Sequence, residues 1–304
     1  MFDSVDHSGM TLDQIRIFLC VAEHSHVTHA ARELNLTQSA VSAAIAALER
    51  QHDVRLFDRV GRGIVLTDEG AGFLDTARAL MAQADTARLV LEDLAGTPQG
   101  HLRIFASQTV AAYWLPSRLM TLNRDFPRVR ISLTIGNTSG AAQAVGEGSA
   151  DIGFVEGDLP PSDLKRLVVA QDELVLVMAR DHPMARKPQY TAGDYRALNW
   201  LMREPGSGTR TVSEAHLSDM GLTPDDLNVV LEFPSNEAII AGLQTGQCAA
   251  MLSRRALGAA RAQGLAIRRV TWAQRPLRPF AVLTHPDRHR TRALEALMEI
   301  VRPR

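Results

Sequence analysis

The spacing of apolar residues near the start of the chain predicts a helix with one buried face. Between Thr37 and Glu49 the apolar positions recur at i, i+3, i+4 and i+7, namely Val41, Ala44, Ile45 and Leu48. Thr37 is suited to cap this helix, because its hydroxyl can accept a hydrogen bond from a first-turn amide. Gln38, Ser39 and Ser42 are short polar residues near the start of the helix, and we expect this end to stay free of the core.

A shorter helix is predicted immediately upstream, over residues 27–34, and Asn35 and Leu36 make a tight connection to Thr37. The small residues Ala30 and Ala31 allow two helices to approach closely. Two helices joined by a short turn, with small residues at the crossing, are typical of a helix-turn-helix. The second helix of that motif enters the major groove of DNA.

Two short apolar stretches surround a glycine-flanked arginine over residues 55–67. They predict a β-hairpin that would hold Arg59 and Arg62 beside the longer helix, where guanidinium groups can meet phosphates or the minor groove. Residues 11–66 contain six Arg and six Asp or Glu, so this region has no net charge. Composition alone therefore does not reveal a DNA-binding face.

Residues 67–95 predict one long helix, capped by Thr67 and with Asp68 and Glu69 in its first turn, where the helix dipole favours negative charge. Its apolar positions alternate at intervals of four and three and form a heptad seam: Phe73, Ala77, Leu80, Ala84, Ala87, Leu91 and Leu94. The helix could pack on its own domain or pair with a second chain. We favour pairing, because charged residues occupy the other faces of the helix.

Beyond a predicted hinge at residues 96–100, strands and helices alternate with short connections, which predicts a parallel sheet covered by helices. The expected strands are 101–106, 129–135, 151–155, 173–179, 200–202, 229–231, 249–252 and 280–284, and the expected helices are 116–126, 141–147, 211–220, 236–243 and 292–301. We assign lobe I to about 101–168 and 273–304, and lobe II to about 169–272. Two α/β lobes with two crossovers resemble a type 2 periplasmic-binding-protein fold, which binds small ligands between the lobes.

The sequence resembles the bacterial LysR-type transcriptional regulators over nearly its whole length. The matching N-terminal positions are Ala30, Ala31, Leu34, Thr37 to Ser42, Ile45, Leu48, Glu49 and Leu56 to Arg59, and the matching C-terminal ones include Leu115, Pro116, Leu119, Phe126, Pro127 and Gly148 to Gly153. Two positions depart from the family pattern. His26 stands where a serine usually begins the second helix, which calls that cap into question. Ala43 and Ala44 stand where a basic residue often follows Ser42, which predicts fewer phosphate contacts.

The resemblance implies a winged helix-turn-helix over 1–66, a dimerising linker helix over 67–95, a hinge at 96–100 and an effector-binding domain over 101–304. It implies a regulator that binds promoter DNA as a dimer or tetramer, responds to a small effector and works with RNA polymerase. The residues expected at the DNA are Thr28, Thr37, Gln38, Ser39, Ser42, Arg59 and Arg62. Gln38, Ser39 and Ser42 would contact base edges, and the arginines would contact phosphate or the minor groove.

Four segments rich in hydroxyl, amide and glycine residues follow predicted strands and open helices, at 107–109, 137–140, 206–210 and 235–236. Helix N-termini offer free amides and partial positive charge, so several that converge form an anion site. Arg210 would add a bidentate fork for carboxylate, sulfate or phosphate. The expected effector-binding residues are Ser107, Gln108, Thr109, Asn137, Thr138, Ser207, Gly208, Thr209, Arg210, Ser235 and Asn236. Ordinary helix caps are the alternative, but four segments at equivalent strand ends favour a ligand.

A small-anion-handling enzyme or a cytoplasmic solute-binding protein could use the same cleft. The sequence contains no Gly-x-Ser-x-Gly elbow, P-loop lysine or metal-binding pair, so we predict no catalytic residue and no cofactor. A solute-binding role does not explain the residues before position 101, and no signal peptide is evident.

Composition restricts the class of protein but does not indicate a function. A chain of 304 residues suggests two or three domains, and 45% hydrophobic with 22% charged residues is ordinary for a folded soluble protein. No run of about 18 apolar residues occurs, so we expect a cytoplasmic protein without a membrane partner. The two cysteines, Cys20 and Cys248, are expected to be buried. His24, His26 and His29 invite a metal interpretation by their spacing, but we predict no metal site because they lack a cysteine or carboxylate ligand set.

Overall fold

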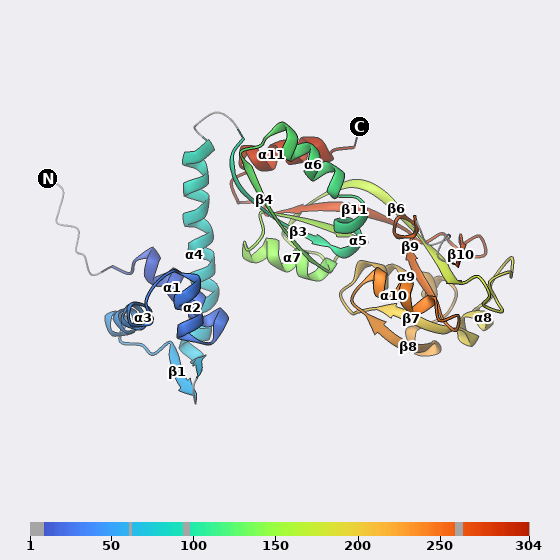
Figure 1. Ribbon diagram of the computed structural model, residues 1–304, viewed down its shortest axis with the longest axis horizontal. Coiled ribbons are helices and arrows are strands. Elements are labelled where there is room, and N and C mark those ends of the chain that lie inside the picture. The colour runs from blue at the N-terminus through green and yellow to red at the C-terminus, as the bar shows by residue number, and fades with distance from the viewer. Residues whose placement is uncertain (1–8, 61–62, 94–97, 259–263, 304) are drawn as a thin grey trace. The chain divides into compact units, whose positions relative to one another are not determined.

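Helices and a short hairpin come first along the chain, then the long helix α4 (Asp68–Asp93), and then a mixed sheet covered by helices (Figure 1). The computed structural model describes residues 9–60, 63–93, 98–258 and 264–303, except for the side chains of residues 85, 86 and 88–93. Its contacts divide the chain into two units, 1–91 and 92–304, which we describe separately. Among the described helices, none has the length and apolar character needed to span a membrane.

The first unit is a helix-turn-helix followed by a hairpin, as the sequence predicts. Its elements are α1 (Leu12–His24), α2 (Val27–Glu33), α3 (Gln38–His52), β1 (Phe57–Val60), β2 (Gly63–Leu66) and α4. Thr37 caps α3, because its hydroxyl accepts a hydrogen bond from the amide of Ala40 at 3.2 Å. Asn35 takes the left-handed conformation, with φ 54°, in the turn between α2 and α3, and asparagine tolerates this better than most residues. His26 occupies the N-cap of α2 without a side-chain hydrogen bond to the helix, so the cap that the family pattern would supply is missing.

An aromatic cluster holds the first unit together. The Phe18 ring is fully buried, with its centroid 5.3 Å from that of Phe57 on β1 and 5.0 Å from that of Phe73 on α4. Ala77 is also fully buried in this core. Phe73 and Ala77, the first positions of the predicted seam, therefore pack on their own domain.

The later part of the seam is more open. Leu80 is 40% exposed, Ala84 is half-buried and Ala87 is exposed. The Leu91 side chain and Leu94 lie outside the described residues. The apolar pattern of α4 thus combines two roles that sequence alone presents as one stripe, with packing on the domain first and an uncovered apolar face after it.

In the second unit, the described strands form one nine-stranded mixed sheet in the order β4, β3, β5, β11, β6, β9, β7, β8, with β10 paired to β6. The strands are β3 (Gly100–Ser107), β4 (Val129–Gly136), β5 (Ile152–Glu156), β6 (Lys165–Ala179), β7 (Asn199–Arg203), β8 (Asn228–Phe233), β9 (Ala249–Ser253), β10 (Leu265–Arg268) and β11 (Leu277–Thr284). The helices are α5 (Gln108–Tyr113), α6 (Pro116–Asp125), α7 (Thr138–Glu147), α8 (Ala192–Ala197), α9 (Gly208–Asp219), α10 (Asn236–Leu243) and α11 (Arg292–Val301).

The sheet is not wholly parallel, which corrects the sequence-based expectation. β3 runs parallel to β4 and β5, and β7 runs parallel to β8 and β9, but β6 and β11 are antiparallel to their neighbours. β6 pairs with β11 over residues 165–173 and with β9 over residues 174–178, so one strand joins the two halves of the sheet. β11 leads back. Antiparallel pairing follows because the chain crosses between the lobes once in each direction.

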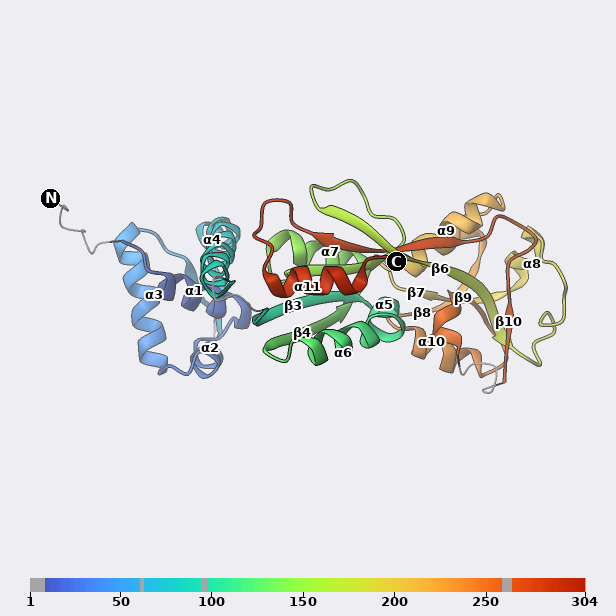
Figure 2. The same ribbon diagram turned by 90° about the horizontal axis from the view of Figure 1, so that it is seen from above.

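Each lobe has its own cover of helices (Figure 2). α6 packs beside α11, and side chains from both join the core cluster around Leu102, Ile104 and Phe280. α7 supplies the other face through a second cluster that includes Val145 and Leu283. The carboxyl ends of β3, β4 and β5 lead into the segments that build the candidate effector site described below.

Candidate DNA-binding and effector sites

A groove of about 330 Å³ lies between the recognition helix α3 and the hairpin in the first unit. Thr28, Gln38, Ser42 and Arg59 line it, so the structure brings four of the predicted DNA-contacting residues to one surface. Gln38 and Arg59 are exposed, while Thr28 and Ser42 are half-buried. A concave polar surface with an exposed arginine beside a helix N-terminus suits contact with nucleic acid.

The other predicted DNA-contacting residues are placed differently. Thr37 and Ser39 are exposed at the start of α3, where their hydroxyl oxygens lie 3.0 Å apart. Arg62 lies outside the described residues. Arg55 also lines the groove and is paired with Asp58 at 3.4 Å, and sequence reasoning missed it. Its place directly before the hairpin was the available signal.

Glu49 provides the negative charge of the groove and has a structural partner. Its Oε1 accepts hydrogen bonds from the backbone amides of Leu56 at 2.8 Å and Phe57 at 3.2 Å. The carboxylate therefore fixes the hairpin against α3. This contact explains why a glutamate stands in a groove suited to phosphate.

In the second unit, hydrogen bonds link the four predicted segments to one another around Glu156 at the end of β5. Thr109 and Thr209 donate hydrogen bonds to Glu156 Oε1 at 3.0 and 3.2 Å. Thr138 donates to the Glu156 backbone carbonyl at 3.1 Å. Asn236 Nδ2 in turn donates to Thr109 Oγ1 at 3.1 Å. The helix starts of α5, α7, α9 and α10 are thereby linked through buried polar side chains.

Arg278 of β11 supplies the charge that balances Glu156. Its Nη1 lies 3.1 Å from Glu156 Oε1 and donates to Thr209 Oγ1 at 2.9 Å. Its Nε donates to Asp172 Oδ2 at 2.9 Å, and Ser253 donates to the other Asp172 oxygen. Arg278 and Glu156 are each 1% exposed. A buried ion pair of this kind persists only when further hydrogen bonds satisfy its lone pairs and protons.

Three buried atoms of this cluster have no hydrogen-bond partner among the described residues: Ser107 Oγ, Glu156 Oε2 and Arg278 Nη2. Native interiors rarely leave such atoms unpaired, because each costs free energy when it is removed from water. Two of the three belong to the Glu156–Arg278 ion pair itself, and the third, Ser107 Oγ, lies at the start of α5.

Other predicted effector residues have structural partners of their own. Arg210, which was expected to offer a fork to an anion, pairs with Glu214 at 2.8 Å and with Glu232. Gly208 allows close packing: a Cβ there would lie 2.0 Å from the Glu156 carbonyl oxygen. Ser235 caps α10 through the amide of Ala238.

Two further residues of the predicted set bridge between elements. The Asn137 side-chain amide donates to the Pro205 carbonyl at 3.4 Å. Gln108 donates to Glu237 at 2.5 Å and accepts from the Asn236 amide. Ser207 is buried as the N-cap of α9 and accepts from the Thr209 amide at 3.2 Å.

Sequence reasoning missed Glu156, Asp172 and Arg278, the charged centre of the cluster. All three are charged residues within or beside apolar stretches, and such residues are rarely buried unless paired. That pattern was the available signal, but it does not indicate which charges pair.

Comparisons with known proteins agree with both units. Residues 12–71 match the family model of the bacterial regulatory helix-turn-helix protein, lysR family, and residues 95–304 match the LysR substrate binding domain. The chain belongs to the LysR family of transcriptional regulators. It is 33% identical over 298 residues to the HTH-type regulator YeiE of Escherichia coli, which covers 97% of this chain and 98% of that protein. It is 35% identical to CbbR of Rhodospirillum rubrum over 250 residues, 82% of each chain.

The fold is shared with full-length LysR-family structures. CbnR in complex with its target DNA matches with a TM-score of 0.70 and 21% identity, covering 96% of this chain and 99% of that one. The chain is thus a DNA-binding transcriptional regulator with an effector-binding domain. Because the members of this family are regulators, the enzyme and solute-binding alternatives are set aside.

Proposed function

We propose that this LysR-family regulator binds, between its two lobes, a small oxyanion that also carries a hydrogen-bond donor. The observation that supports this proposal is the set of three unpartnered atoms around Glu156 among the described residues. Arg278 Nη2 and Ser107 Oγ can donate to an anionic group, while the ionised Glu156 carboxylate can only accept. A ligand that satisfies all three atoms presents acceptor oxygens to the arginine and serine and a donor to Glu156.

This requirement narrows the class of effector. Hydrogen phosphate and small hydroxycarboxylates combine negative oxygens with an O–H donor. Sulfate and simple carboxylates lack the donor. Their negative oxygens would be repelled by the Glu156 carboxylate, and Glu156 Oε2 would stay without a hydrogen bond. The carboxylate thereby acts as a selectivity element within an anion site.

Calorimetric titration of the full chain with matched anions tests the proposal. Hydrogen phosphate is compared with sulfate, and glycolate with acetate, so that each pair differs in one donor. We expect the first member of at least one pair to bind at least about fivefold more tightly, because an unpaired buried acceptor costs about 1–3 kcal/mol. Equal binding within both pairs, or binding by none of the four anions, would contradict the proposal.

Three variants locate the site. Ser107→Ala removes one donor and is expected to weaken anion binding. Ser132→Ala is the matched control, because Ser132 lies exposed on β4 outside the cluster. Glu156→Gln replaces an acceptor-only group with one that can also donate, so it should reduce the preference for phosphate over sulfate. Weakening by Ser132→Ala as large as that by Ser107→Ala would place the anion elsewhere.

The DNA-binding proposal assigns roles on the first unit. Gln38, Ser39 and Ser42 contact base edges in the major groove, whereas Thr28, Thr37, Arg59 and Arg62 contact the backbone or the minor groove. The shared groove and the exposure of Gln38 and Arg59 support this division.

Assembly completes the proposed mechanism. Two chains pair along α4 at Leu80, Ala84, Ala87 and Leu91, and two dimers form a tetramer. Exposure of Leu80 supports this pairing. Effector binding in the cytoplasm changes the spacing of the DNA-binding domains on the promoter and hence the contact with RNA polymerase.

A further inference from the structure

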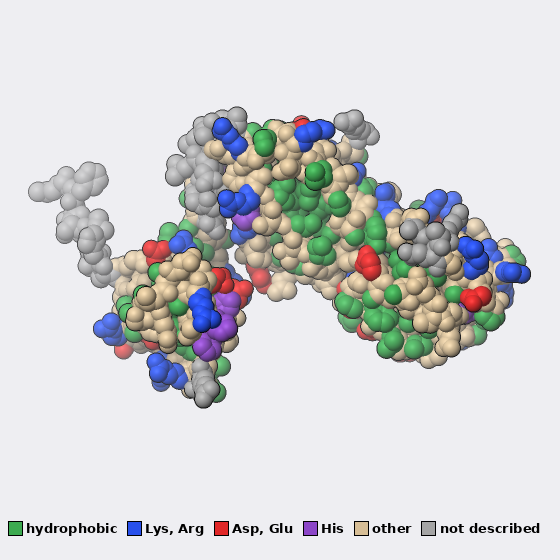
Figure 3. Space-filling view, viewed as in Figure 1, with side chains coloured by type: hydrophobic (Ala, Val, Ile, Leu, Met, Phe, Trp, Pro, Cys, Tyr) green, Lys and Arg blue, Asp and Glu red, His purple; other side chains and the backbone are tan. Residues whose placement is uncertain are grey.

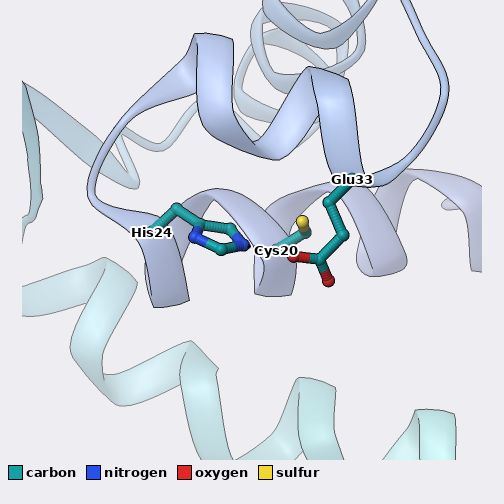
Figure 4. Close-up of side chains that lie close together, drawn as sticks. All are labelled: Cys20, His24 and Glu33. Atoms are coloured by element: carbon teal, nitrogen blue, oxygen red, sulfur yellow. Dashed lines mark hydrogen bonds and ion pairs between the residues drawn. The ribbon is translucent and has the colours of Figure 1, made fainter.

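Two helices of the DNA-binding unit bring a thiol, an imidazole and a carboxylate together. Cys20 and His24 are four residues apart on α1, so they lie on one face of that helix, and Glu33 projects from α2. The ligand atoms of the three side chains all lie within 4.8 Å of one another. Figure 4 shows the His24 ring and the Glu33 carboxylate directed toward each other, with the Cys20 sulfur beside them.

We infer that Cys20, His24 and Glu33 form a binding site for a zinc ion that links α1 to α2. Thiolate, imidazole and carboxylate are the ligands that Zn²⁺ takes in proteins, and in a tetrahedral site their donor atoms lie about 3 to 4 Å apart. The cluster therefore needs only small side-chain rotations to close around an ion. This site goes beyond the effector cleft and does not depend on it.

Each of the two helices carries a histidine four residues from another cluster-facing residue. Cys20 and His24 are spaced in this way on α1. His29 lies four residues before Glu33 on α2, and its ring centroid is 6.4 Å from that of His24. The surface of this unit shows histidine side chains gathered in one patch (Figure 3). Histidine spacing alone predicted no metal because a cysteine and a carboxylate seemed to be missing. The helix crossing supplies both.

Other contacts of these residues are weaker than metal coordination. The Cys20 sulfur lies 3.8 Å from the Ala30 carbonyl oxygen, a long contact for a weak donor. His24 Nε2 and Glu33 Oε2 lie 2.5 Å apart, and their side chains are 31% and 57% exposed. A contact so exposed contributes little to stability, and the exposure leaves a path for an ion.

Burial raises the pKa of the Cys20 thiol, and the negative charges of Glu33 and Glu23 raise it further. The same negative charges attract a divalent cation.

Metal titration of the purified full chain, stripped with a chelator and then freed of it, tests the inference. Zn²⁺ is titrated in competition with a chromogenic chelator, and Co²⁺ serves as a spectroscopic substitute because its bond to a thiolate gives a charge-transfer absorption band. We expect one strongly bound Zn²⁺ per chain and a Co²⁺–thiolate band. Failure of the chain to compete with the chelator, or absence of the band, would overturn the inference.

The chain offers matched controls because it contains two cysteines. Cys20→Ala should abolish the thiolate band, whereas Cys248→Ala, in the second unit, should keep it. Glu33→Gln and His24→Gln change exposed or half-buried side chains and should lower Zn²⁺ affinity by at least about tenfold. Glu23→Gln removes a neighbouring carboxylate outside the cluster and should keep most of the affinity. A thiolate band that survives Cys20→Ala, or affinity unaffected by both Glu33→Gln and His24→Gln, would show that the metal binds elsewhere.

Discussion

The two polar sites of this regulator differ in what their side chains contact. On the DNA face, Gln38, Ser39 and Arg59 are exposed. In the second unit, Glu156 and Arg278 are 1% exposed and bind each other and neighbouring hydroxyls. The first site consists of exposed side chains, whereas the second is a buried cluster that satisfies most of its own charges.

This difference separates recognition from stability. An exposed polar side chain can be replaced with little effect on folding, because water replaces its contacts. A buried charge that loses its partner has no such compensation. Variants of the DNA face should therefore change binding alone, whereas variants of the Glu156–Arg278 cluster should change the free energy of unfolding as well.

The largest effect is expected from Arg278→Met. The change leaves the Glu156 and Asp172 carboxylates buried without the cation between them, and breaking such a pair costs about 3–5 kcal/mol. Chemical denaturation followed by tryptophan fluorescence measures this loss in the right unit, because all three tryptophans, Trp114, Trp200 and Trp272, belong to the second unit. Arg210→Met is the control, since Arg210 pairs with the partly exposed Glu214 and Glu232. Equal losses in the two variants would remove the contrast between buried and exposed pairs.

Gln38→Ala should have the next largest effect, on sequence preference alone. A bidentate amide contact to a base contributes about 1–3 kcal/mol of discrimination, and Gln38 is exposed at the start of α3. This preference is measured by binding to the DNA upstream of the protein's own gene and to single-base variants of that DNA. We expect weaker discrimination and unchanged unfolding. A drop in stability comparable to that of Arg278→Met would place Gln38 in the fold rather than at the DNA.

Arg59→Ala should weaken binding to every DNA sequence by a similar factor. If Arg59 neutralises one phosphate, the slope of log affinity against log salt should become shallower by about one. Arg16→Ala is a suitable control, because Arg16 is exposed on α1, pairs with Asp13 and does not line the groove. A salt slope unchanged by Arg59→Ala would mean that this arginine does not contact phosphate.

The smallest effect concerns pH and the second unit. Burial lowers the pKa of His216 from its ordinary value of 6.5. The unfolded chain therefore binds this proton more readily than the folded one. The neutral, buried His216 imidazole stabilises the folded chain fully above pH 6.5. This contribution to the free energy of unfolding is lost as the pH falls from 6.5 through the lowered pKa, by at most about 1.4 kcal/mol per pH unit. In His216→Gln, the free energy of unfolding should change less with pH when denaturation is measured on both sides of pH 6.5. The same pH dependence in the variant and the wild type would contradict this role of His216.

Much of the fold follows from local patterns, as the helix-turn-helix illustrates. The apolar spacing of α3 and the Thr37 cap specify that helix without reference to the rest of the chain. The direction of β6 does not follow in this way, because pairing with β11 and β9 is set by contacts far apart in sequence. Residues 165–172 at the start of β6 are mostly exposed, so their pattern lacks the alternation that marks a strand.

The candidate effector site shows the same limit. Its helix starts were predictable because serine, threonine and asparagine mark N-caps locally. The pairing of Glu156 with Arg278 was not, since the two residues are distant in sequence and meet only after the sheet forms. Local sequence also could not show which residues pair with Arg210. Its position beside a glycine-serine loop suggests an anion fork, and in the fold Glu214 and Glu232 contact its guanidinium.

We propose that DNA preference belongs to α3 and that effector response belongs to the Glu156–Arg278 cluster. DNA binding of the wild-type chain, Gln38→Ala and Ser107→Ala, each with and without hydrogen phosphate or glycolate, tests both assignments. We expect the anion to change wild-type DNA binding. Gln38→Ala should lose sequence preference but still respond to the anion. Ser107→Ala should keep its sequence preference but no longer respond to the anion. Loss of both properties in either variant, or a full anion response in Ser107→Ala, would contradict the account.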